Sequence, residues 1–139
     1  MNSEEELGDL IIDVYKNLKT RIERDLKVYE IGMGQLQILM VFFEKTEGSF
    51  TQNELVKILG VDKGNISRSL RKLSAKGYIE PVEGRKLYQL SEKGKQLKTE
   101  IISAFIHINA VMTRGTNATQ VDQTIQTLNR LNENLENSI

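Results

Sequence analysis

The segment from Thr51 to Gly94 is the feature that most restricts how this chain can fold. Residues 51–59 and 63–76 each carry apolar side chains at helical spacing, and Gly60-Val61-Asp62 lies between them. This pattern predicts two short helices joined by a tight turn, because glycine and a capping aspartate mark where one helix ends and the next begins. The segment therefore predicts a helix-turn-helix.

A predicted β-hairpin follows the second helix. Gly77 is the expected helix stop, and the two short runs 78–82 and 87–90 are rich in strand-forming residues. They flank Glu83-Gly84-Arg85-Lys86, which predicts a tight turn. Pro81, the only proline, suits an edge strand because it has no N–H to donate to a ladder. The hairpin completes a winged helix-turn-helix.

Longer apolar stretches on both sides of this segment predict further helices. Residues 33–44 are apolar nearly all round, which predicts a buried central helix, and the first helix is expected to run to about Glu30. The narrow apolar stripes of the two chain ends are typical of helices that pack on a partner chain. Their proposed dimerisation residues are Leu7, Leu10, Ile11 and Val14, with Ile125, Leu128, Leu131 and Leu135.

These elements predict a mainly α, α+β winged-helix fold with long terminal helices. We expect one domain over residues 1–139, in which residues 32–94 form the winged helix-turn-helix part. Residues 1–30 and 95–139 form the helical part, for which dimerisation is the expected role. The length suffices to bury a core.

The composition argues against several classes of protein. The chain has no cysteine and one histidine, so a thiol nucleophile is excluded and a zinc site is not expected. We find no catalytic constellation and predict neither enzymatic activity nor a cofactor. The acidic N-terminus does not resemble a signal peptide, and no apolar run approaches the ~20 residues of a membrane span. The expectation is a cytoplasmic protein without membrane contact.

Charge is unevenly distributed, although the 19 basic and 19 acidic side chains cancel. Residues 51–95 hold 10 basic and 5 acidic side chains, whereas residues 1–50 hold 6 and 10. A basic middle between acidic or neutral ends is typical of polyanion binding, and it is also compatible with an ordinary solvated face.

The helix over residues 63–76 is the predicted reader of double-stranded DNA. In a helix-turn-helix the first turns of the second helix enter the major groove, where Asn pairs with adenine and Arg with guanine through two contacts. The candidate groove residues are Lys63, Gly64, Asn65, Ser67 and Arg68, with Arg71 and Lys72 better placed for phosphate or packing. A charged solvent-facing helix surface is the alternative.

Two further sites are predicted to hold the duplex. Arg85 at the hairpin tip is the candidate minor-groove probe, because narrow minor grooves attract arginine, and Lys86 is a candidate phosphate contact. Thr51 and Gln52 stand at a helix N-terminus, where free N–H groups suit a phosphate. The alternatives are a merely soluble turn and a purely local helix cap.

With these pieces placed, the chain resembles the MarR family of prokaryotic transcriptional regulators over nearly its whole length. The resemblance is sharpest in Asn53-Glu54-Leu55, Leu59-Gly60-Val61, Asn65-Ile66-Ser67-Arg68, Leu70-Arg71-Lys72-Leu73, Lys76-Gly77-Tyr78-Ile79 and Leu90-Ser91-Glu92-Lys93-Gly94. It implies a homodimer on a pseudo-palindromic operator, often a repressor relieved by a small aromatic or anionic ligand. The wing is shorter than is typical and lacks the acidic-then-arginine tip, for which Arg85 is the nearest counterpart.

Two other functions are compatible with a winged helix. One is a protein-interaction module without an operator, since fold does not fix function. The other is an architectural protein that coats DNA without sequence preference, whose binding would be dominated by salt.

Overall fold

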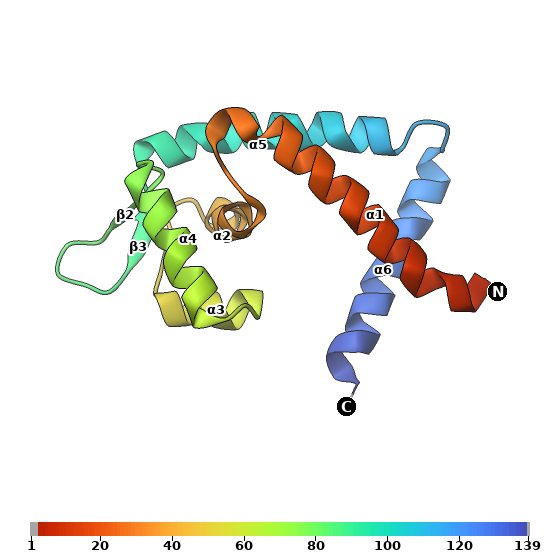
Figure 1. Ribbon diagram of the computed structural model, residues 1–139, viewed down its shortest axis with the longest axis horizontal. Coiled ribbons are helices and arrows are strands. Elements are labelled where there is room, and N and C mark those ends of the chain that lie inside the picture. The colour runs from red at the N-terminus through yellow and green to blue at the C-terminus, as the bar shows by residue number, and fades with distance from the viewer. Residues whose placement is uncertain (1–2, 139) are drawn as a thin grey trace. The chain divides into compact units, whose positions relative to one another are not determined.

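The computed structural model describes residues 3–138, with side chains described from residue 5. Its elements are α1 (Ser3–Asp25), the 3-10 helix η1 (Lys27–Tyr29), α2 (Met33–Glu44), β1 (Ser49–Phe50), α3 (Gln52–Leu59), α4 (Lys63–Ala75), β2 (Ile79–Pro81), β3 (Tyr88–Leu90), α5 (Glu92–Met112) and α6 (Ala118–Asn137). The predicted class is confirmed: helices dominate, and one small antiparallel sheet forms the wing (Figure 1). The chain divides into two compact units, one up to Phe105 and one from Ile106.

The first helix ends earlier than the apolar pattern predicts. The prediction extended it to about Glu30, but α1 stops at Asp25 and the chain continues as η1. Leu26 is fully buried at this break, and Glu30 adopts a left-handed conformation with φ 57°. Tyr29 lies close to Glu100 of α5, and burial together with this carboxylate raises the pKa of Tyr29. Tertiary packing of Leu26 and Tyr29 therefore overrides the continuous stripe.

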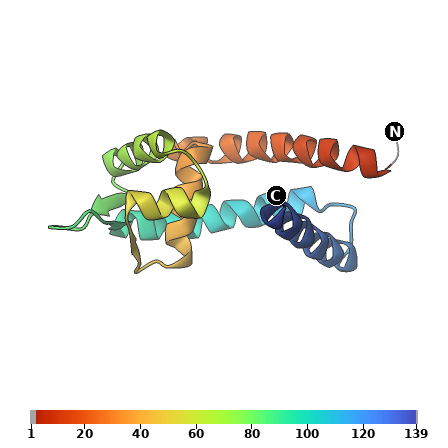
Figure 2. The same cartoon turned by 90° about the horizontal axis from the view of Figure 1, so that it is seen from below.

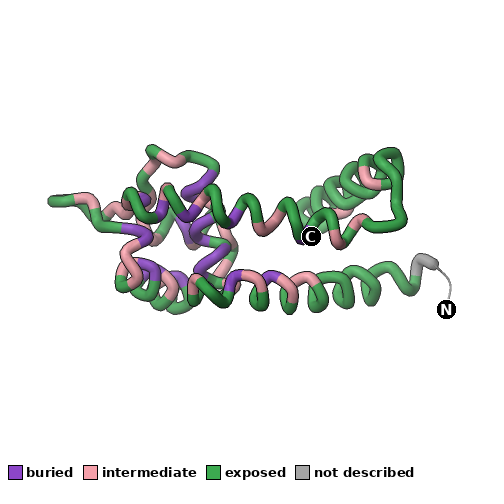
Figure 3. The backbone as a smooth tube through the Cα atoms, turned by 90° about the horizontal axis from the view of Figure 1, so that it is seen from above, coloured by how far each residue is buried: buried purple, intermediate pink, exposed green. Residues whose placement is uncertain are grey.

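Helix α2 is the central element, as its apolar sequence predicts. Leu36, Ile38, Leu39 and Phe42 are buried, and α2 packs against both α3 and α4. The contact with α4 is close, because a Cβ on Gly34 would lie 3.0 Å from the Ser69 hydroxyl. We call residues 33–90, from α2 to β3, the winged-helix body; buried residues gather in it, while the first turns of α1 are exposed (Figure 3).

The two predicted strands, β2 and β3, join β1 in a three-stranded antiparallel sheet of order β1-β3-β2. Pro81 lies on edge strand β2 opposite Tyr88, in the place predicted for a residue without an N–H donor. Phe50 of β1 also pairs with Tyr88, and its ring meets Phe42 edge to face with centroids 5.1 Å apart. The sheet is thereby anchored to the core through α2.

Helix α5 begins against the hairpin and requires a glycine there. Ser91 caps the helix by accepting a hydrogen bond of 3.0 Å from the Gly94 N–H. A Cβ on Gly94 would lie 2.1 Å from the Tyr78 carbonyl oxygen, so no larger residue fits without moving the backbone. Leu97 and Ile101 of the same helix are buried.

The second unit contains the rest of α5 and the whole of α6. Helix α6 is capped by Asn117, which forms a capping box with Gln120. Asn117 lies directly before the first helical residue, where its carbonyl and side chain reach the free N–H groups. Ile125, Leu128 and Leu135 on α6 are exposed, and Leu131 is half-buried.

Among residues 3–138, no helix is both long and apolar enough to cross a bilayer. Over the same range, no group of three or more histidine, cysteine, aspartate or glutamate side chains is arranged to hold a metal ion.

Candidate nucleic-acid interface

Local capping sets the start of both helices of the helix-turn-helix. The Thr51 hydroxyl accepts from the Glu54 N–H at 3.0 Å, and the Glu54 carboxylate accepts from the Thr51 N–H at 3.0 Å. Gly60 ends α3 in the left-handed region at φ 64°, and the Asp62 carboxylate then accepts from the Asn65 N–H at 2.9 Å to cap α4. These predicted signals fix where the first turn of α4 lies.

Helix α4 divides into a buried face and an exposed face. Ile66, Leu70 and Leu73 are buried against the body. The predicted reader residues lie on the exposed side, with Ser67 half-buried: Lys63, Gly64, Asn65, Arg68, Arg71 and Lys72. The helix therefore presents a polar and basic surface that its own core does not use.

The first turn of α4 carries a connected set of polar side chains. Asn65 Nδ2 donates to Asp62 Oδ2 at 2.7 Å, and Asn65 Oδ1 accepts from Arg68 Nη2. A Cβ on Gly64 would lie 3.2 Å from both Arg68 Nη1 and Asp62 Oδ1, so the guanidinium lies directly over this glycine. The sequence identified three of these residues as groove contacts but not the bonds that join them.

The hairpin projects beyond the helices of the winged-helix body (Figures 1 and 2). Its turn is closed by the Arg85 N–H, which donates to the Val82 carbonyl at 3.1 Å, and Gly84 adopts φ 73°. That conformation favours glycine at the third position of the turn. The turn leaves Arg85 and Lys86 exposed at its tip.

A recess of about 590 Å³ brings the start of α3, the start of α4 and the wing together. It is lined by Thr51, Gln52, Asn53, Lys63, Pro81, Arg85, Lys86, Leu87 and Tyr88. Gln52 spans the two helices by donating from Nε2 to the Lys63 carbonyl at 3.4 Å. Three cations and no carboxylate line the recess among the described residues, so its electrostatics suit a polyanion.

Only some of the predicted DNA-binding residues line the recess. Thr51, Gln52, Lys63, Arg85 and Lys86 meet there, whereas the other α4 candidates are not among its lining residues. Asn53 and Tyr88 were missed as lining residues. Tyr88 pairs with both neighbouring strands, and this position follows from the strand register rather than from its residue type.

Lys76, at the end of α4, turns inward rather than toward a ligand. Its ammonium donates to Gln35 Oε1 at 2.8 Å and to the Glu30 carbonyl, and burial lowers its pKa against the opposing effect of Glu30. Gln35 is itself buried. Lys76 therefore fastens the end of α4 to the start of α2, and its charge is unavailable to the exposed face.

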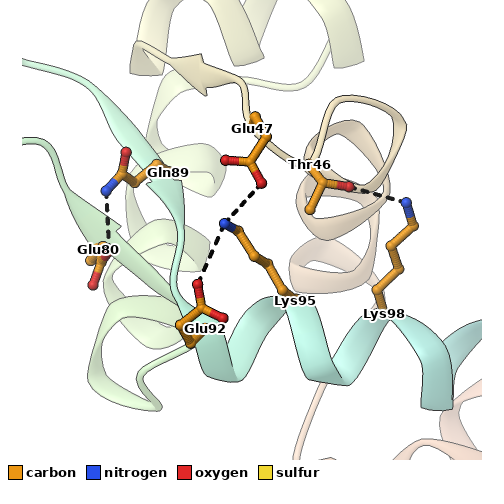
Figure 4. A network of polar contacts seen from close by, with 7 residues as sticks. All are labelled: Thr46, Glu47, Glu80, Gln89, Glu92, Lys95 and Lys98. Atoms are coloured by element: carbon orange, nitrogen blue, oxygen red, sulfur yellow. Dashed lines mark hydrogen bonds and ion pairs between the residues drawn. The ribbon is translucent and has the colours of Figure 1, made fainter.

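The charge of Lys95 is also engaged by partners within the protein. It pairs with Glu47 at 3.0 Å and Glu92 at 3.5 Å, and the hydrogen bond to Glu47 is the largest cause of its raised pKa (Figure 4). Nearby, Lys98 donates to the Thr46 hydroxyl at 3.1 Å. Part of the positive charge of residues 51–95 is thus used internally, and the remainder concentrates on α4 and the wing.

A separate groove of about 400 Å³ is lined by residues of α1, α2, α3 and α5. Most of its lining is apolar: Ile22, Met33, Leu36, Met40, Val41, Ile58, Leu59 and Phe105, with Gln37 and Glu44 as the polar members. Ile58 of α3 is 55% exposed and lines this groove. It lies one turn beyond Leu55, which is the buried residue of α3.

Comparisons with known proteins agree with this geometry. Residues 31–86, which cover most of the winged-helix body, match the profile of the MarR family. The HTH-type transcriptional regulator BilQ of Clostridioides difficile (strain CD3) is 27% identical over 106 residues, which are 73% of this chain and 70% of BilQ.

Solved structures show the same fold along almost the whole chain. A MarR transcriptional regulator from Methanosarcina mazei Go1 superimposes with a TM-score of 0.85 at 26% identity, covering 95% of this chain and 96% of that one. A mutant MarR from E. coli complexed with operator DNA gives a TM-score of 0.76 at 24% identity, covering 90% and 92%.

Proposed function

The chain belongs to the MarR family, and from this premise we propose that it is a homodimeric, sequence-specific repressor that binds double-stranded DNA. Its fold is that of DNA-binding transcriptional regulators. The proposal has four parts: the protein represses transcription, forms a homodimer, binds an operator and responds to an effector.

One observation carries the proposal. The basic recess beside the exposed first turns of α4 places Lys63 of α4 and Arg85 and Lys86 of the wing on one side of the winged-helix body. A major groove accepts one α-helix, and an adjoining minor groove attracts a wing arginine. A scaffold protein would not need this concentration of cations without a carboxylate among its described lining residues.

The exposed apolar stripes support the homodimer. Leu7, Leu10, Ile11 and Val14 of α1 are at least 40% exposed, and Ile125, Leu128 and Leu135 of α6 are also exposed. Contiguous apolar surface of this kind marks an interaction site. Two copies related by a two-fold axis would present two α4 helices to half-sites about one helical turn, ~34 Å, apart.

The groove beside α2 is our candidate effector site. Its lining is mainly apolar, and Glu44 is the charged member among the described residues that line it. An acidic rim disfavours a carboxylate, so within the class of small aromatic or anionic ligands we propose a neutral aromatic compound. Such a ligand would relieve repression only if it prefers a conformation that fits the operator poorly.

Matched pairs of small aromatics test this site. The amide and the carboxylate of the same ring system are added to the protein, and the shift in Tm is measured. We expect the amide to stabilise the protein more, and Met40→Glu to abolish that shift. Equal stabilisation by the carboxylate, or a shift that Met40→Glu leaves intact, would contradict the assignment.

Selection of binders from a random pool of duplex DNA tests the DNA-binding proposal. The selection uses near-physiological salt and an excess of non-specific competitor, because specificity is meaningful only at a stated salt concentration. We expect a two-fold symmetric consensus with half-sites about 10 base pairs apart. Tight binding without a consensus would identify an architectural protein, and no binding would identify a protein-interaction module.

A further inference from the structure

We propose that Asn65 is a positioning residue that sets the base preference of Arg68 rather than reading a base itself. Asp62 and Gly64 complete the arrangement, the first by holding Asn65 and the second by leaving room for the guanidinium. The inference rests on the proposed function, because it assumes that the first turns of α4 enter a DNA groove.

Hydrogen bonds within the protein engage both polar atoms of the Asn65 amide. Nδ2 donates to the Asp62 carboxylate at 2.7 Å, and Oδ1 accepts from Arg68 Nη2. Asparagine reads adenine with this same oxygen and nitrogen, so it would compete with its own partners in the protein. Arg68 uses one guanidinium nitrogen for this bond and retains most of its five N–H donors for a ligand.

The backbone of α4 anchors this chain of bonds. The same Asp62 carboxylate that holds the Asn65 amide also accepts from the Asn65 N–H at 2.9 Å and caps the helix. The orientation of the amide is thus tied to the helix start. Arg68, one turn later, is thereby held relative to the helix rather than free in solvent.

Gly64 supplies the space for the guanidinium. A Cβ at this position would lie 3.2 Å from Arg68 Nη1 and 3.2 Å from Asp62 Oδ1, closer than ordinary van der Waals contact. Glycine costs stability inside a helix compared with alanine, so its use in the first turn requires a compensating role. The space above Gly64 is that role, because it lets the planar fork of Arg68 lie along the exposed face.

These four residues are exposed, and individual bonds at such a surface contribute little to folding stability. Their effect is on binding. An arginine side chain loses rotamer freedom when it binds, and a guanidinium already held in one orientation loses less. We therefore expect Asp62, Gly64 and Asn65 to act on specificity at the base pair that Arg68 contacts.

The test compares base preference position by position. Wild type, Asn65→Ala, Arg68→Ala and the double variant Asn65→Ala/Arg68→Ala are each titrated with the selected duplex. The same titrations use every single-base-pair variant of one half-site. Circular dichroism and Tm confirm that each variant keeps the fold.

We expect Arg68→Ala to remove discrimination of about 5- to 100-fold at one base pair, which corresponds to the loss of a bidentate contact. Asn65→Ala should relax preference at that same base pair, by a smaller factor. The double variant should resemble Arg68→Ala alone, because a positioning residue has no effect once the group it positions is gone.

Two further variants separate positioning from helix structure. Asp62→Asn retains a good N-cap, but it removes the carboxylate that accepts from the Asn65 amide, so specificity should fall at the Arg68 base pair without loss of helix. Gly64→Ala should raise Tm and yet relax the same base pair. A uniform loss of affinity on all sequences would instead assign Gly64 to close approach of the DNA backbone.

The inference is overturned if Asn65→Ala changes preference at a different base pair from Arg68→Ala, with additive losses in the double variant. That result would make Asn65 a direct reader. If the wild-type protein selects no consensus at all, the proposed function fails instead. The two failures are distinguishable, because the selection uses the wild-type protein before any variant is tested.

Discussion

The winged-helix body and the terminal helices differ in how far their apolar residues are buried. In the body Leu55, Leu70 and Leu73 are almost fully buried by α2, α3 and α4 within one chain. On the terminal helices the apolar stripe stays open, with Leu10 53% and Leu135 74% exposed. The body buries its core within one chain, whereas we propose that a partner chain covers the stripes. We infer that the body specifies DNA and the stripes specify assembly.

Breaking the assembly should have the largest effect on DNA binding. A charge in the stripe, as in Leu128→Glu or Ile11→Glu, should separate the protomers, because burying an unpaired carboxylate is costly. Two linked heads gain about 10²- to 10⁴-fold in affinity over one, so operator affinity should fall by that factor. Sedimentation equilibrium and DNA titration measure the two effects.

Gln123→Glu is the matched control for Leu128→Glu. It adds the same charge to α6 on the side away from Ile125 and Leu128 by helical periodicity, and residue 123 is exposed. It should leave both association and DNA binding unchanged. If Leu128→Glu behaves like this control, α6 does not form the interface.

Truncating a leucine should distinguish the two regions by concentration dependence. Leu73→Ala opens a cavity in the body and should lower the free energy of unfolding by about 2–5 kcal/mol. Leu10→Ala should act only through association, so its effect on Tm should shrink as the protein is diluted below the dissociation constant of the dimer. Denaturation at two protein concentrations checks both. A concentration-independent loss for Leu10→Ala would place that residue in an intramolecular core.

The two capping boxes allow a local comparison of the regions. Thr51→Ala and Asn117→Ala each remove a side-chain acceptor at a helix start, and each should cost about 0.5–2 kcal/mol of stability. Only Thr51→Ala should also weaken DNA binding, since Thr51 lines the basic recess. Thr51→Ser keeps the acceptor and is the control. If Thr51→Ala binds DNA as tightly as wild type, Thr51 acts only as a helix cap.

Loss of one wing cation should have the smallest effect. Lys86→Ala should weaken binding to the consensus and to unrelated duplexes by the same factor. It should also reduce the salt slope of log K by about 0.9, the value of one phosphate contact. Lys19→Ala, on exposed α1, serves as the control. A loss confined to the consensus would make Lys86 a base reader instead.

Local signals in the sequence sufficed for most of the fold. Helix α2 has its predicted bounds, Thr51 and Asp62 cap α3 and α4 as predicted, and Pro81 lies on an edge strand. Each of these features depends on residues within a few positions of one another. Such short-range patterns are readable because the backbone groups they satisfy are fixed by secondary structure alone.

Features that depend on distant contacts were not predictable in this way. The break after Asp25 depends on burial of Leu26, and the inward turn of Lys76 depends on Gln35 and the Glu30 carbonyl. Within the candidate site, residue types on α4 were sufficient to predict a groove-facing surface. They were not sufficient to show that Arg68 is held by Asn65, because that depends on side-chain rotamers.

The mass of the complex on the selected duplex tests the central claim most directly. Sedimentation equilibrium with a duplex that contains both half-sites should give two chains per duplex. Deleting one half-site should lower the affinity for the duplex by far more than a factor of two. A complex of one chain per duplex with undiminished affinity would contradict the account, because the body would then read DNA without the assembly that the stripes were inferred to provide.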